Sequence, residues 1–87
     1  MKLLLLTRQG CCLCEGLAER LAGLDPAPQV QLVEVDADPA LQRRYGLEVP
    51  VLMLPMPNGQ PQELPRVPPR LAGAQLAEWL QRQISKL

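Results

Sequence analysis

Residues 2–15 of the chain read KLLLLTRQGCCLCE, and this stretch decides the interpretation of the rest. The segment Lys2–Thr7 contains the apolar run Leu3–Leu6 and leads into the polar loop 8–10, which is typical of a central strand buried on both faces. Three cysteines follow, and leucines then recur at helical spacing as far as about residue 24. The stretch therefore predicts a strand, a short loop and a helix, with the cysteines at the start of the helix.

The same apolar run followed by a cysteine is also found at the start of lipoprotein export signals. Here the run is short, because Arg8 and Gln9 interrupt it before Cys11. An export signal needs roughly 7–15 apolar residues, and a membrane span needs ~20. We therefore expect residues 3–6 to form a buried strand, and we expect no association with a membrane.

Composition excludes several classes of protein. With 87 residues the chain can build one core only, so we expect a single domain over residues 1–87. Nine basic and nine acidic residues cancel and aromatic residues are only 2%, which argues against a nucleic-acid partner. The absence of histidine excludes Cys-His and Ser-His-Asp catalysis and any metal site containing histidine. Three cysteines do not supply the four ligands of structural zinc, so no metal is expected.

The remaining elements follow from hydrophobic periodicity and from turn residues. Strands are expected at 29–35, 49–54 and 60–67, and helices at 39–45 and 70–87. The adjacent apolar pair Leu32-Val33 suggests that the strand 29–35 is buried on both faces.

Capping and turn signals delimit the middle of the chain. Asp38 is expected to cap the second helix with Pro39 at its first position, and Gly46 to end it. Asn58-Gly59 predicts a hairpin turn, and the prolines that follow confine the strand 60–67 to an edge or make it irregular. The order β-α-β-α-β-β-α predicts an α/β fold with a four-stranded mixed sheet flanked by helices, the first two strands being parallel.

Cys11 and Cys14 form a Cys-x-x-Cys motif where a strand passes into a helix. Unpaired N–H groups and the positive end of the helix dipole favour a thiolate there, so Cys11 should ionise more readily than an ordinary thiol. Arg8 is expected to add a positive charge, with a solvated loop arginine as the alternative. Cys14, one turn later, is placed to resolve a mixed disulfide formed by Cys11. Half of a zinc ribbon is the competing interpretation, and it lacks its second half.

Local chemistry suggests a role for Cys12 and for the Val49-Pro50 dipeptide. Cys12 is expected to be a small residue at the helix start rather than a second nucleophile, because a vicinal disulfide ring with Cys11 is strained. Val49-Pro50 opens a strand, and a trans bond is the more frequent form. If this dipeptide lies beside the cysteines, the backbone of Val49 is available to pair with an extended substrate segment.

The chain resembles the thioredoxin superfamily, and most closely its small glutaredoxin-like domains. The resemblance rests on the run Thr7–Glu15 and on the segment Tyr45–Leu52, and it covers nearly all 87 residues. It implies a thioredoxin-like fold, with Cys11 as the nucleophile, Cys14 as the resolving thiol and Pro50 as a cis-proline facing them. It also implies that Arg8 belongs to a glutathione-binding set, with glutathione as a co-substrate and no tightly bound cofactor.

The chain also departs from the glutaredoxin pattern. Cys12-Leu13 stands between the outer cysteines where glutaredoxins usually have Pro-Tyr, and Glu48 stands where they have threonine before Val-Pro. Thioredoxins have tryptophan where this chain has Gly10. The glycine pair and aspartate that hold the glutamyl end of glutathione have no evident counterpart between residues 59 and 73. These differences leave open whether glutathione binds.

The sequence thus predicts a monomeric, cytoplasmic thiol–disulfide oxidoreductase. Its partner is expected to be a disulfide-containing protein or a low-molecular-weight thiol. One alternative is a dimeric, glutathione-dependent carrier of an iron–sulfur cluster or a metal. The other is a non-catalytic interaction module with the same fold.

Overall fold

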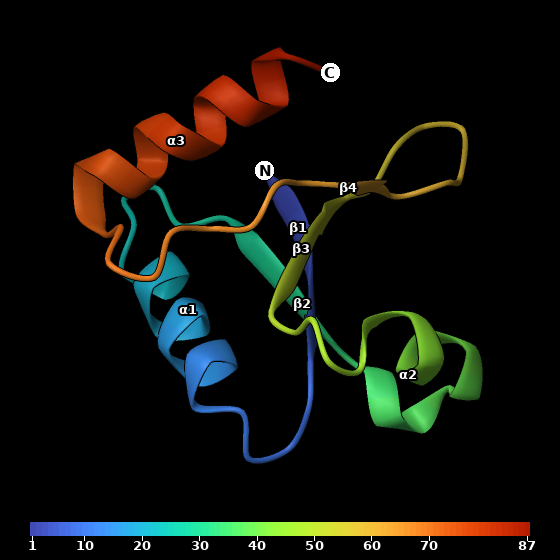
Figure 1. Ribbon diagram of the computed structural model, residues 1–87. Coiled ribbons are helices and arrows are strands. Elements are labelled where there is room, and N and C mark those ends of the chain that lie inside the picture. Colours follow the sequence, from blue (N-terminus) through green and yellow to red (C-terminus); the bar gives the residue numbers. More distant parts are fainter.

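The computed structural model describes residues 1–87 and contains four strands, three α-helices and one short 3-10 helix (Figure 1). In chain order these elements are β1 (Lys2–Thr7), α1 (Cys12–Ala22), β2 (Gln29–Glu34), η1 (Val35–Ala37), α2 (Pro39–Tyr45), β3 (Val51–Leu54), β4 (Gln62–Glu63) and α3 (Gly73–Ser85). The predicted order of elements is confirmed. No helix combines the length and the apolar character needed to cross a bilayer.

The four strands form one mixed sheet in the order β2-β1-β3-β4. β1 pairs with β2 in parallel and with β3 in antiparallel fashion, and β3 pairs antiparallel with β4. The apolar run of β1 thus occupies the centre of the sheet, as predicted. Its side chains alternate between the two faces, so that Leu3 and Leu5 are fully buried on one side and Leu6 is buried on the other.

Two hydrophobic clusters lie on opposite faces of the sheet. The larger packs the sheet against α1 and α3, and the smaller packs it against η1 and α2. In Figure 1, α1 and α3 lie to the left of the strands and α2 lies to the right. The larger cluster consists of Leu3, Leu5, Leu17, Leu21, Leu52, Leu64, Val67, Leu76 and Leu80. The smaller consists of Leu6, Val35, Tyr45, Val51 and Met53.

The prediction that the strand 29–35 is buried on both faces is wrong. β2 is an edge strand that pairs only with β1, and Leu32 is 61% exposed. The adjacent pair Leu32-Val33 therefore does not reflect burial on both faces. Four of the six residues of β2 are exposed and none is buried, so the elements packed on the faces of the sheet cover this edge incompletely.

Other boundaries shifted for local reasons. The returning strand is reduced to the two residues of β4, because prolines on both sides cannot donate to a sheet ladder. α3 begins at Gly73 rather than at residue 70, and α1 ends at Ala22, before the Asp25-Pro26 turn. The predicted hairpin is present, since β3 and β4 pair antiparallel around Asn58-Gly59.

α2 has the capping that was predicted. The carboxylate of Asp38 accepts the N–H groups of Ala40 and Leu41, and Pro39 opens the helix. Gly46 ends it, but in right-handed conformation (φ −55°, ψ −32°), so the turn does not require the freedom of glycine. It requires space, because a Cβ there would meet the backbone oxygen of Gln42.

Candidate active site

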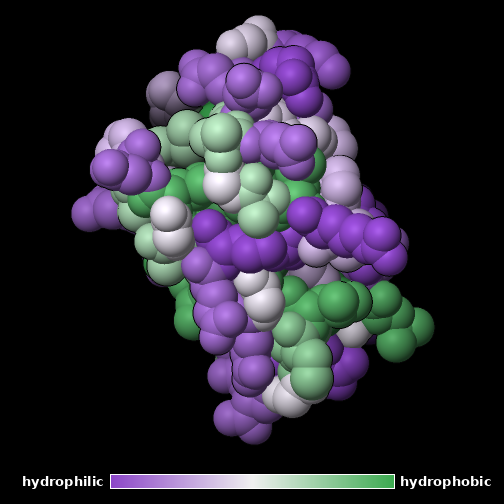
Figure 2. Space-filling model, turned by 90° about the vertical axis from the view of Figure 1, so that its left-hand side faces the viewer, coloured by the Kyte–Doolittle hydropathy of each residue, from purple (hydrophilic) through white to green (hydrophobic).

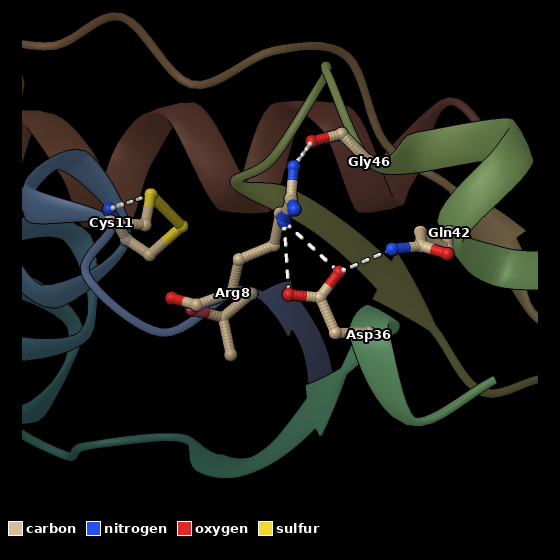
Figure 3. Close-up of polar contacts among 7 residues, drawn as sticks. Arg8, Cys11, Asp36, Gln42 and Gly46 are labelled. Carbon is tan, nitrogen blue, oxygen red and sulfur yellow. Dashed lines mark hydrogen bonds and ion pairs between the residues drawn. A yellow bond between two sulfur atoms is a disulfide. The ribbon is translucent and has the colours of Figure 1, made fainter. Parts of the chain in front are cut away.

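Cys11 and Cys14 form a disulfide at the amino end of α1. Their Cα atoms are 5.2 Å apart, which is usual for a disulfide. Cys11 is the N-cap residue of α1, and its Sγ accepts the backbone N–H of Cys14 at 3.1 Å (Figure 3). The helix itself begins at Cys12, one residue later than predicted. A donor of the first helical turn is thus directed at the Cys11 sulfur.

The three cysteines differ in exposure. Cys14 is 2% exposed, whereas Cys11 is half-buried and Cys12 is exposed and free. A substrate that approaches from solvent therefore meets the sulfur of Cys11, while Cys14 is reached only from Cys11. The disulfide does not involve Cys12.

Arg8 connects the cysteine loop with the loop that precedes Pro50. Its backbone carbonyl accepts the N–H of Cys11 at 3.3 Å. Its guanidinium donates through Nη1 to the carbonyl of Gly46 at 2.9 Å, and its Nε lies 3.1 Å from both carboxylate oxygens of Asp36 (Figure 3). Asp36 is held in turn by the side chain of Gln42 at 3.2 Å. One residue therefore positions both walls of the candidate site.

The guanidinium of Arg8 forms an ion pair with Asp36, which the sequence did not predict. The sequence suggested that it adds positive charge beside Cys11, but Asp36 forms an ion pair with it and neutralises that charge. The pair is separated by 28 residues along the chain, so no local pattern connects the two.

The Val49–Pro50 peptide bond is cis. The N–H groups of Glu48 and Val49 both donate to the carbonyl of Tyr45, at 2.8 and 3.2 Å. The carbonyl of Val49 accepts no hydrogen bond within the chain. Backbone pairing between Val49 and a substrate segment is therefore open through the carbonyl only, not through the N–H.

Pro50 lies close to the cysteine run. It shares a shallow hollow of about 30 Å³ with residues of α1 and of the segment that follows β4. We call this the Pro50 hollow, and it is lined by Leu13, Leu17, Arg20, Pro50, Arg66, Val67 and Pro69. Leu13, which stands between Cys11 and Cys14 in the sequence, thus shares this hollow with Pro50.

The sequence interpretation missed the two arginines of this hollow. Arg20 donates to the carbonyls of Gly16 and Pro68, each at 3.3 Å, and to that of Leu71. Arg66 donates to the carbonyl of Glu48 at 3.3 Å. Neither position carries a local signal, since isolated arginines on a helix and in a proline-rich segment are most often solvated.

No group of three or more cysteine, aspartate or glutamate side chains is arranged to hold a metal ion.

The polar contacts of Tyr45, in the smaller hydrophobic cluster, connect two elements of the fold. The Tyr45 hydroxyl donates to the carboxylate of Glu63 at 3.1 Å and accepts from Arg44, which raises the pKa of that guanidinium above its ordinary value. These contacts connect α2 with β4.

Comparison with known proteins agrees with this arrangement. Residues 2–81 match the family described as Glutaredoxin-like domain (DUF836). The chain belongs to this glutaredoxin-like family. No curated protein matches it.

A solved structure supports the same fold for this glutaredoxin-like domain. It is the X-ray structure of a Northeast Structural Genomics target protein from X. campestris, which is 35% identical in sequence. The match has a TM-score of 0.62 and covers 92% of this chain and 96% of that chain. The fold, a four-stranded mixed sheet flanked by helices, is thioredoxin-like.

Proposed function

We propose that this glutaredoxin-like domain is a thiol–disulfide oxidoreductase. The observation that carries the proposal is the Cys11–Cys14 disulfide at the start of α1, in which Cys11 is half-buried and Cys14 is 2% exposed. This difference suits a pair in which one thiol exchanges with the substrate and the second completes the exchange.

The reaction proceeds in two exchanges. The Cys11 thiolate attacks one sulfur of a substrate disulfide, so that a Cys11–substrate bond forms and the other substrate sulfur leaves as a thiolate. Deprotonated Cys14 then attacks the Cys11 sulfur and releases the second substrate thiolate. The substrate disulfide gains two electrons and two protons overall, and the protein dithiol becomes the disulfide. Two equivalents of a thiol, or one of a dithiol, restore the reduced pair.

The surroundings of Cys11 favour its role as the nucleophile. The N–H of Cys14 and the amino end of α1 stabilise negative charge on its sulfur. The unpaired carbonyl of Val49, next to Pro50, is available to accept an N–H from an extended substrate segment. We extend the proposal to a monomer in the reducing cytoplasm. Its substrate is a disulfide-bearing protein or a low-molecular-weight disulfide such as that of glutathione, and Arg8 belongs to the substrate-binding residues.

A trapping experiment tests the mechanism. In a Cys12→Ser background, Cys14→Ser removes the resolving thiol, so the mixed disulfide formed by Cys11 should persist. The reduced variant is mixed with a disulfide peptide or with glutathione disulfide, and intact mass spectrometry without reducing agent should show one adduct per chain, on Cys11.

The matched controls separate this mechanism from adventitious oxidation. Cys12→Ser alone should form the Cys11–Cys14 disulfide and retain no adduct, and Cys11→Ser with Cys12→Ser should form very little adduct because Cys14 is buried. Absence of any adduct on Cys14→Ser, with every disulfide offered, would contradict the two-thiol mechanism.

A further inference from the structure

Two arginines of the Pro50 hollow carry charge that no carboxylate neutralises. The pair Arg8–Asp36 is the single ion pair of the chain. Arg20 is bonded to three backbone carbonyls and Arg66 to one. A carbonyl accepts a hydrogen bond but carries no net charge, so these contacts leave the positive charges of both arginines in place.

The other lining residues of the Pro50 hollow are apolar, and exposed leucines lie in the segments that form it. Leu13, in the wall of the hollow, is 61% exposed, and Leu47, just before the Glu48 carbonyl that Arg66 binds, is 98% exposed. Figure 2 views the molecule from the side of α1 and shows hydrophobic surface beside strongly hydrophilic surface. A hollow of about 30 Å³ accommodates only the end of one side chain. A partner that also covers Leu13 and Leu47 must be larger than one side chain, and a protein segment has the required size.

Acidic groups line a second hollow that also contains Pro50. This hollow, of about 130 Å³, contains Glu48 and Glu63 and shares Pro50 and Arg66 with the first. The carboxylate of Glu63 accepts the Tyr45 hydroxyl, whereas the side chain of Glu48 makes no hydrogen bond. Arg66 therefore lines both a hollow that contains two glutamates and a hollow that contains Arg20 and Leu13.

We propose that Arg66 selects protein substrates that carry an aspartate or glutamate close to their reactive cysteine, an inference that rests on the proposed oxidoreductase function. The substrate carboxylate forms a charge-assisted hydrogen bond with the exposed Arg66 guanidinium. Arg20 adds a second positive charge without moving, because its carbonyl contacts hold it in place. Apolar side chains of the same segment cover Leu13 and Leu47.

A pair of disulfide peptides tests this selection. The two peptides are identical except for an aspartate or an asparagine two residues from the cysteine, and the rate of oxidation of the reduced protein is measured with each. The wild type should react about two- to five-fold faster with the aspartate peptide at low ionic strength, as expected for one exposed ion pair. The preference should decline as salt is added.

Arg66→Gln should remove the difference between the two peptides, and Arg66→Lys should retain part of it. Arg82→Gln, in the last turn of α3, is the matched control and should keep the full preference. Equal rates for the two peptides with the wild type, or a preference that survives in Arg66→Gln, would overturn the selection while leaving the redox function intact. If neither peptide oxidises the wild type, the oxidoreductase proposal itself fails.

Discussion

At the scale of single residues, Arg8 makes the most connections in the candidate active site. Its carbonyl holds the amide of Cys11, and its side chain holds Asp36 and the carbonyl of Gly46. The loop that carries Cys11 and the loop that carries Pro50 are therefore attached to the same residue. The contribution of Arg8 to the free energy of unfolding can be measured without a substrate.

We expect Arg8→Gln to lower the free energy of unfolding by about 1–2 kcal/mol, because it removes the ion pair and the bond to the Gly46 carbonyl. Asp36→Asn should cost less, since the bond from Arg8 to Gly46 remains. The side chains of both residues are about one third exposed (35% and 34%), so a double-mutant cycle should give a coupling of only about 0.2–1 kcal/mol. Urea denaturation measures all three values, and a coupling of zero would show that the ion pair has no energetic role.

Some residues of the candidate site belong to short sequence motifs, whereas others carry no local signal, for a physical reason. Cys11, Cys14 and Pro50 belong to short motifs whose spacing carries their chemistry, and the structure brings Pro50 beside the cysteine run. Asp36 and Arg66 act through residues 28 and 18 positions away, and a single sequence records no pairing at such distances. Their roles depend on how the loops pack.

At the scale of elements, the end of α2 determines where the Pro50 loop starts. Gly46→Ala would bring a Cβ against the backbone oxygen of Gln42, and that oxygen belongs to a helix that cannot easily shift. We expect the free energy of unfolding to fall by about 1–3 kcal/mol, as for other overpacked sites. Thermal and urea unfolding provide the measurement.

Gly16→Ala is the matched control for that variant. Gly16 lies inside α1, and a Cβ there meets no atom within 4 Å. The variant should be more stable than the wild type by about 0.5–1 kcal/mol, because alanine is the better helix former. If both alanine variants were neutral, the close approach at Gly46 would not be a constraint.

Among the elements, those with a complete local signal were predicted best. β1 has the predicted bounds, and Asp38 and Pro39 start α2 as expected. The exposure of β2 and the shortness of β4 depend on which strands lie at the edges of the sheet. Edge position follows from strand order, and the apolar pattern of a strand does not encode it.

At the scale of the whole molecule, α3 completes the larger hydrophobic cluster. Leu76 is fully buried there, so Leu76→Ala should lower the free energy of unfolding by about 2–5 kcal/mol. That is a large part of the roughly 5–15 kcal/mol available to a small domain. Leu87, which is 52% exposed, provides the comparison, and its alanine variant should change stability by less than about 0.5 kcal/mol. Equal effects in urea denaturation would mean that α3 is not part of the cooperative core.

The isolation of Cys12 from the disulfide has a practical consequence for the intact protein. The chain has three cysteines, of which Cys11 and Cys14 are joined and Cys12 is free. A colorimetric thiol titration in denaturant should therefore find one free thiol per chain in the oxidised protein and three in the reduced protein. The free thiol of Cys12 serves as an internal standard. The fraction of protein with the Cys11–Cys14 disulfide can then be measured in buffers of known redox potential without a label.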